Sequence, residues 1–167
     1  MHDKLPKNVD VVNLARANAM VKGYFDVSEL DRVSSQVIAN DAKISAEFEF
    51  SFCEDNNRAV LLKGKVDSKL LFTCNRCNDT VSYKIRSKIE LLLCKDASVI
   101  ENIPSSLEVI EIEDRQNFNL QELVEEETLL SMPLIAKHPV DVCSAEGEYM
   151  TSLSEEEELE LNPFESL

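Results

Sequence analysis

The chain has 167 residues, of which 44% are hydrophobic, with three glycines, five prolines and no tryptophan, a composition that argues against a repeat protein or a low-complexity chain. Its formal net charge of −15 repels phosphate backbones at long range, so contact with a nucleic acid would require a local basic surface. The first eight residues carry no apolar run, and no stretch approaches the roughly 18 apolar residues of a membrane span. We therefore expect a cytoplasmic protein without membrane contact.

The N-terminal part of the chain predicts two helices around a short strand. Residues 10–20 have apolar side chains near helical spacing, and residues 21–26 favour a strand. Ser28 is predicted to be the N-cap of a second helix. The apolar stripe of this second helix would consist of Leu30, Val33, Val37 and Ile38.

The middle of the chain predicts three antiparallel strands in a meander. Residues 44–53 alternate between apolar and polar side chains, and the alternation resumes in residues 60–67 after a turn at 54–57. A third alternating segment covers residues 83–91.

The two turns also predict the register of the meander. With one turn centred near Asn56, Phe50 faces Leu62 and the pairs on the polar face are Glu49–Lys63 and Glu47–Lys65. With the other centred between Arg76 and Cys77, the pairs are Lys69–Lys84, Asp67–Arg86 and Lys65–Lys88. Both registers collect apolar residues on one face of the sheet and charged residues on the other.

The C-terminal part predicts one more strand and one more helix. Residues 107–113 are expected to form a strand. Asn119 and Glu122 resemble a capping box at the start of a helix that Pro133 ends. The buried stripe of this helix would consist of Leu120, Leu123, Val124 and Leu130.

These elements predict an α+β fold in which an antiparallel β meander of about four to six strands is flanked by N-terminal and C-terminal helices. Residues 1–145 would form the single domain. Residues 146–167 include the run Glu155–Glu158 and hold no basic residue, so we expect an acidic, disordered tail.

Four side chains predict a metal site. Cys74 and Cys77, separated by two residues at a tight turn, can direct both sulfurs at one ion, as in a zinc knuckle. His138 and Cys143 could complete a Cys3His zinc site after the C-terminal helix. The alternatives are free thiols that shape the turn, or a redox pair, which usually opens a helix rather than joining two strands. The five cysteines, an odd number, do not favour a disulfide framework.

The basic residues are concentrated in the meander. Residues 58–95 hold nine basic and three acidic side chains, while the rest of the chain is strongly acidic. The candidate contacts for an RNA backbone are Lys69, Arg76, Lys84, Arg86 and Lys88. The alternative is an internally neutralised face, in which Glu47, Glu49, Asp67 and Glu90 pair with the basic side chains.

An acidic cluster at residues 122–127, together with the acidic tail, could receive a basic partner such as a ribosomal protein. A solvated helix face and a solubilising tail would explain the same residues. No serine–histidine–acid constellation, phosphate loop or glycine-rich nucleotide motif is present, so we do not expect an enzyme.

The chain resembles the YceD family. The resemblance lies in the Cys-x-Arg-Cys element at residues 74–77, in the helix from Asn119 to Pro133, in the segment 138–143, and in the closing Asn162-Pro163-Phe164. It covers nearly the whole chain. Other branches of the family carry more cysteines after the helix than the single Cys143 here.

The resemblance implies a non-enzymatic factor in ribosome biogenesis. Such a factor would support the synthesis, processing or stability of 23S ribosomal RNA, in contact with this RNA or a pre-ribosomal particle. The residues expected to bind a protein partner are Glu122, Glu125, Glu126 and Phe164. Two alternatives remain open: an acidic escort for a basic ribosomal protein that never touches RNA, and a zinc- or thiol-dependent enzyme.

Overall fold

The computed structural model describes residues 3–38, 41–53, 56–96 and 107–143. The predicted tail, including Phe164, lies outside these described residues and stays a prediction. Within the described parts of the chain, none of the helices is both long enough and apolar enough to cross a membrane.

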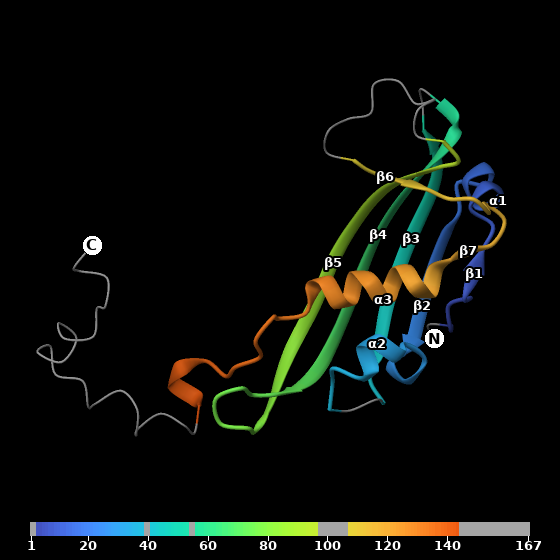
Figure 1. Cartoon of the computed structure of the whole chain (residues 1–167). Coiled ribbons are helices and arrows are strands. Elements are labelled where there is room, and N and C mark those ends of the chain that lie inside the picture. The colour runs from blue at the N-terminus through green and yellow to red at the C-terminus, as the bar shows by residue number, and fades with distance from the viewer. Residues whose placement is uncertain (1–2, 39–40, 54–55, 97–106, 144–167) are drawn as a thin grey trace, which may run out of the picture.

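The centre of the molecule is a curved five-stranded sheet with the order β2-β3-β4-β5-β6 (Figure 1). Its strands are β2 (Met20–Asp26), β3 (Lys43–Cys53), β4 (Asn56–Thr73), β5 (Thr80–Cys94) and β6 (Glu108–Glu111). The first four strands are antiparallel neighbours, so the predicted meander is confirmed and extends to β2.

The last strand differs from the expectation, because β6 runs parallel to β5. The sheet is therefore mixed, and the prediction of a wholly antiparallel sheet is wrong at this edge. A parallel neighbour needs a long crossover, and the connection between Cys94 and Glu108 supplies one. Alternation of side chains reveals which face each residue takes, but it does not reveal the direction of a strand.

The predicted register of both hairpins is confirmed. Phe50 lies opposite Leu62 and Glu47 opposite Lys65 in the β3–β4 pair. Lys69 lies opposite Lys84 in the β4–β5 pair. Since a slip by one residue would turn every apolar side chain to the other face, the buried face fixes this register.

The β4–β5 hairpin is longer than the rest of the sheet. The last pairing between β3 and β4 is at Ser68. Beyond it, five further pairs, from Lys69–Lys84 to Thr73–Thr80, continue as a two-stranded ribbon. This ribbon carries the turn between β4 and β5 away from the sheet (Figure 1).

One glycine allows the close packing of the sheet's core face. Phe48 is fully buried, and its ring lies against Gly64 on the neighbouring strand. A Cβ atom at residue 64 would come within 2.5 Å of Phe48 Cδ1. The core therefore requires the absence of a side chain at this point of β4.

We expect Gly64→Ala to lower the free energy of unfolding by about 1–3 kcal/mol, because the added methyl group overpacks a filled core. Urea denaturation measures this change. Ser82→Ala, at an exposed position of β5, is the control and should leave stability within about 0.5 kcal/mol of the parent. Equal stability of the two variants would contradict the packing described for Phe48.

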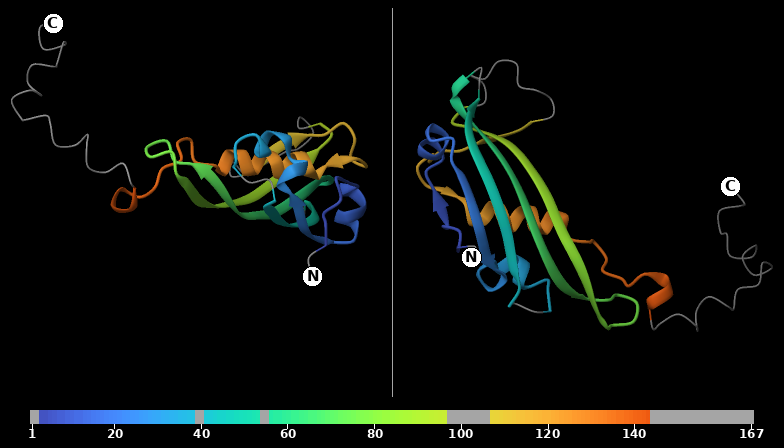
Figure 2. Two further views of the ribbon diagram at one scale, coloured as in Figure 1. Left: turned by 90° about the horizontal axis from the view of Figure 1, so that it is seen from below. Right: turned by 180° about the vertical axis from the view of Figure 1, so that it is seen from behind.

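The helices pack on one face of the sheet. The predicted C-terminal helix is confirmed as α3 (Leu120–Ser131), and the Asn119 side chain accepts a hydrogen bond from the backbone N–H of Glu122, as expected. Viewed from below, α3 and the short α2 (Asp31–Ser34) lie on the same side of the strands (Figure 2). The view from behind shows the opposite face of the middle strands uncovered (Figure 2).

The N-terminal helices are shorter than predicted. The first, α1 (Val11–Arg16), has Asp10 as its N-cap and ends early, where Asn18 adopts a positive φ of 44°. The second is split into a 3-10 turn, η1 (Val27–Glu29), and α2, so Ser28 is not an N-cap and Ile38 is half exposed. Leu30 and Val33 are buried as expected, and a single turn of helix is enough to bury both side chains.

Two short strands complete the described elements. β1 (Asn8–Val9) and β7 (Phe118–Asn119) form a separate antiparallel pair. This pair joins the N-terminal segment to the start of α3. A last 3-10 turn, η3 (Val140–Val142), follows α3 near the tip of the β4–β5 hairpin (Figure 1).

Candidate functional site

The turn between β4 and β5 places the first two cysteines. The backbone N–H of Cys74 donates to the Asp79 carbonyl at 2.8 Å, and that of Asn78 donates to the Cys74 carbonyl at 2.9 Å. Asn78 takes a left-handed φ of 62°, a conformation that asparagine tolerates better than most residues. This tight turn brings the side chains of Cys74 and Cys77 close together, as the sequence predicted.

The segment after α3 brings the other two candidate ligands to the same place. The Tyr83 hydroxyl donates to the Lys137 carbonyl at 2.6 Å and accepts from the Lys137 N–H at 2.9 Å. The Asn75 N–H donates to the Ala136 carbonyl at 2.8 Å. These bonds hold the segment against the hairpin ribbon, immediately before His138.

The four predicted ligands form one cluster. The thiol sulfurs of Cys74, Cys77 and Cys143 and a ring nitrogen of His138 all lie within 4.8 Å of one another. Cys77 Sγ and His138 Nδ1 are 3.3 Å apart. Ligands placed 2.0–2.3 Å from a tetrahedral ion lie about 3.3–3.8 Å from one another, so a small closure would fit this cluster to a metal.

The hydrogen bonds around the cluster suit metal ligation. His138 Nε2 is 3.1 Å from the Thr80 carbonyl oxygen, which can only accept, so Nε2 carries a proton and Nδ1 faces the sulfurs. Desolvation by burial raises the pKa of the Cys74 thiol, but backbone N–H groups of Cys77, His138 and Arg76 outweigh this effect and lower the pKa to about 5. Hydrogen bonds with Cys74 and Cys77 raise the pKa of His138.

The cluster can therefore hold a metal ion. Three sulfurs and one imidazole nitrogen are a ligand set of structural tetrahedral sites, and Cys74 and Cys143 are both buried. The remaining cysteines, Cys53 and Cys94, lie at strand ends outside the cluster, and none of the five cysteines forms a disulfide. The site would connect the β4–β5 turn to the segment after α3.

The predicted basic residues share the uncovered face of the sheet. Lys69, Lys84 and Arg86 are exposed, as is Lys88, while the next residues along each strand point into the core. Arg76 is exposed at the turn, two residues after Cys74. The structure thus places four of the five candidates on one pleated surface and the fifth at its end.

Part of this face is neutralised internally. Glu47 receives both Lys22 at 3.0 Å and Lys65 at 3.2 Å, and the hydrogen bond from Lys22, with that from Lys65, lowers the pKa of Glu47. Lys63 pairs with Glu90 at 2.8 Å rather than with Glu49. The alternative of a paired, solvated surface therefore describes these five residues of the face.

Asp67 lies on the same face of the sheet. It pairs with Arg86 at 2.9 Å, which neutralises one of the predicted RNA contacts. In the described part of the chain, no ion pair within 4.0 Å involves Lys69, Lys84 or Lys88. These three lysines therefore place positive charge without an ion-pair partner along β4 and β5 toward the hairpin turn.

These lysines face one another across the strands. Lys69 lies directly opposite Lys84, and Lys65 lies directly opposite Lys88. Like charges at directly opposed positions destabilise a sheet, and here two such rows lie on the same face. We call Lys65, Lys69, Lys84 and Lys88 the lysine strip.

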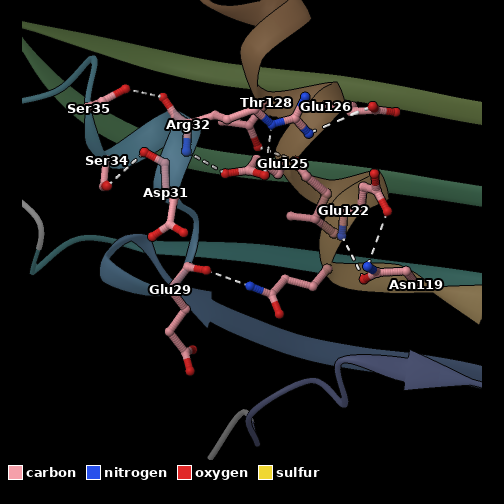
Figure 3. Close-up of polar contacts among 12 residues, drawn as sticks. Glu29, Asp31, Arg32, Ser34, Ser35, Asn119, Glu122, Glu125, Glu126 and Thr128 are labelled. Carbon is pink, nitrogen blue, oxygen red and sulfur yellow. Dashed lines mark hydrogen bonds and ion pairs between the residues drawn. The ribbon is translucent and has the colours of Figure 1, made fainter.

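The predicted acidic cluster on α3 is largely engaged within the molecule (Figure 3). Glu125 accepts from the Arg32 guanidinium at 3.0 Å and from the Arg32 backbone N–H at 2.8 Å. Glu126 lies 3.7 Å from the same guanidinium, and Glu122 accepts from the capping Asn119 side chain. Glu122 and Glu126 are nevertheless exposed, whereas Glu125 mainly attaches α2 to α3.

An apolar surface next to this cluster was not predicted from the sequence. Leu130, assigned to the buried stripe of the helix, is 80% exposed, and Leu134 is 99% exposed. Beside them lies a groove of about 410 Å³, which is lined by the apolar Phe72, Leu129 and Met132 and by the polar Gln36, Thr73 and Asn75. The sequence does contain a hint of this surface. Residues 129–134 hold three leucines, which is more than a single buried stripe of the helix requires.

Comparisons with known proteins agree with the resemblance seen in the sequence. The family model described as "Large ribosomal RNA subunit accumulation protein YceD" matches residues 62–167. A curated protein of Haemophilus influenzae named "Large ribosomal RNA subunit accumulation protein YceD" is 28% identical over 165 residues, which cover 96% of this chain and 92% of the relative. No solved structure matches the chain.

Proposed function

The chain belongs to the YceD family of large ribosomal RNA subunit accumulation proteins, and from this premise we propose that it supports the accumulation of 23S ribosomal RNA by binding, without catalysing a reaction. Its site of action would be the cytoplasm, on large-subunit RNA or a pre-ribosomal particle. The name of the Haemophilus influenzae relative supports the process, and the surface of this chain supports the mode of action.

The lysine strip is the observation that carries the proposal. The two lysines of an opposed pair repel each other in the free protein, above all at Lys69–Lys84, where neither has an ion pair in the described part of the chain, and a phosphate group bound between them would relieve that repulsion. Successive rows at Lys65–Lys88 and Lys69–Lys84 are four residues apart, or about 14 Å along a strand. Such a spacing suits phosphates two or more nucleotides apart on a backbone, and it carries no reading of base sequence.

Zinc is the metal that best fits the cluster at the hairpin turn. Thiolate and imidazole ligands in a tetrahedral set favour this ion over the hard cations that prefer oxygen. Bound zinc would hold the free end of the ribbon against the segment 137–143. The role is structural: it would fix the orientation of Arg76 and of the nearby row Lys69–Lys84.

The test is direct binding of the purified full-length protein to fragments of 23S ribosomal RNA at 50 mM and 200 mM salt, followed by fluorescence anisotropy. Binding through phosphates predicts an affinity that falls about tenfold or more between the two salt concentrations. Absence of binding to any fragment at 50 mM salt would remove direct RNA contact from the proposal.

A second candidate function is the escort of a basic ribosomal protein. The exposed apolar surface favours it, because Glu122, Glu126 and Leu130 share one face of α3 and Leu134 follows directly. An amphipathic basic segment could place apolar side chains in the groove and cations against the two glutamates.

For the escort function we expect the double variant Leu130→Ser, Leu134→Ser to weaken binding of a basic ribosomal protein by roughly tenfold while RNA affinity stays unchanged. Both leucines are exposed, so the fold should be preserved. Met20→Ser is the control, because Met20 is also an exposed apolar residue but lies far from the two leucines in the sequence. Undiminished protein binding in the double variant would exclude this surface as the escort site.

A further inference from the structure

The described chain ends at the turn of the hairpin whose strands carry the lysine strip. Cys143, its last residue, belongs to the same cluster as Cys74 and Cys77, between which Arg76 projects from the turn. The bonds between Tyr83 and Lys137 fix the preceding residues to the ribbon as well. Residue 144 therefore follows directly on the hairpin turn, and the pair Lys69–Lys84 is the member of the strip nearest to that turn.

The sequence that follows has the opposite charge. Residues 144–167 contain eight acidic side chains and no basic one, and four of the acids are the consecutive run Glu155–Glu158. The strip that they would meet holds lysines with no acidic partner in the described part of the chain, apart from Lys65. The two parts of the chain would attract each other through opposite charge rather than through apolar contact.

The distances allow the two parts to meet. Glu155 is twelve positions after Cys143, and a random-coil chain of that length would span about 19 Å root-mean-square. The row Lys69–Lys84 lies four residues from the last strand pair, Thr73–Thr80, or about 14 Å along the ribbon. The acidic run can therefore reach this row, and with some extension the next one.

We propose that the acidic segment 144–167 binds the lysine strip of its own chain and competes there with RNA. This inference rests on the proposed RNA-binding function, because it concerns the same surface. Tethering gives the segment an effective concentration of about 1 mM, so even a weak contact is populated at low salt. RNA, with its denser charge, displaces the segment, whereas short or sparse polyanions do not, and the strip thereby discriminates among polyanions.

The contact is first tested without RNA. Backbone amide NMR spectra of the full-length protein are compared at 50 mM salt with those of two variants: a truncation after Glu146, which keeps Cys143 and the whole cluster, and the quadruple variant E155Q/E156Q/E157Q/E158Q, which keeps the length. We expect shifts of the amides around Lys69, Lys84 and Lys88 in both comparisons, and their loss at 500 mM salt. Spectra that superimpose along β4 and β5 would overturn the inference, whatever the protein does with RNA.

A peptide of residues 147–167, added to the truncated protein, should reproduce these shifts with a dissociation constant of about 0.1–0.2 mM. Both variants should then bind a 23S RNA fragment about five- to tenfold more tightly than the full-length protein at 50 mM salt, and equally at 500 mM. Equal RNA affinity of all three proteins at 50 mM salt would overturn the competition. If none of them binds RNA, the proposed function fails, while the spectra still decide whether the segment occupies the strip.

Discussion

Replacing Cys77 with serine is expected to reduce the zinc content of the purified protein from about one equivalent to below about 0.1. Cys77 would supply one of the four ligands, and its sulfur lies 3.3 Å from His138 Nδ1, so its loss would open the cluster on the side of the histidine. Structural zinc sites contribute folding energy directly, since the ligands are not assembled in the unfolded chain. Metal analysis measures the content, and cobalt substitution reports thiolate coordination by its absorption spectrum.

The structural effect of Cys77→Ser should be confined to one end of the molecule. Cys74 and Cys143 belong to the main core, but most of its residues come from the strands β2 to β5 and the segments that pack on them, so β2 to β5 should stay folded. Hydrogen exchange is expected to accelerate at residues 72–82 and 136–143, which a bound ion would hold together. Cys53→Ser, outside the cluster, is the matched control. Full zinc content in Cys77→Ser, or equal zinc loss in Cys53→Ser, would contradict the assignment.

Neutralising three lysines of the strip is expected to weaken binding of 23S RNA by about 100-fold at 50 mM salt. The triple variant Lys69→Gln, Lys84→Gln, Lys88→Gln removes three cations that have no ion pair in the described parts of the molecule. Each phosphate contact contributes roughly 0.7 to the salt slope of a single strand, so the slope should fall by about 2. Anisotropy titrations at several salt concentrations measure both quantities.

The stability of the same triple variant shows whether it is folded. Removal of like charges from opposed positions should leave the stability unchanged or slightly increased, in contrast to most multiple substitutions. The matched variant changes the net charge equally: Lys4→Gln, Lys22→Gln and Lys43→Gln, whose lysines contact Asp26, Glu47 and the Tyr24 ring. If both triple variants lose the same affinity, RNA binding depends on net charge and not on the strip.

The sequence was most informative where one face of a strand is buried. The pairs Phe50–Leu62 and Lys69–Lys84 could be predicted because a period of two, fixed by a short turn, leaves one register that buries every apolar side chain. The capping residue Asn119 was also predictable, since the orphan N–H groups of a helix start have few possible partners.

Features that depend on distant parts of the chain were less accessible. The parallel direction of β6 is set by a crossover, and nothing in its four residues encodes it. Leu130 has the spacing of a core residue, yet no element covers it in the described structure. The proximity of Cys77 and His138 could be suggested from ligand chemistry alone, but it needed the Tyr83–Lys137 contact, which no local pattern contains.

The order in which the chain is synthesised determines when the cluster at the hairpin turn can assemble. Strands β2 to β5 can pair as soon as they leave the ribosome, because their partners are neighbours in the sequence. His138 and Cys143, by contrast, are translated some sixty residues after Cys77, and α3 must emerge before they can reach it. Until then Cys74 and Cys77 lack the other two members of the cluster, so the four side chains can meet only after α3 has been translated.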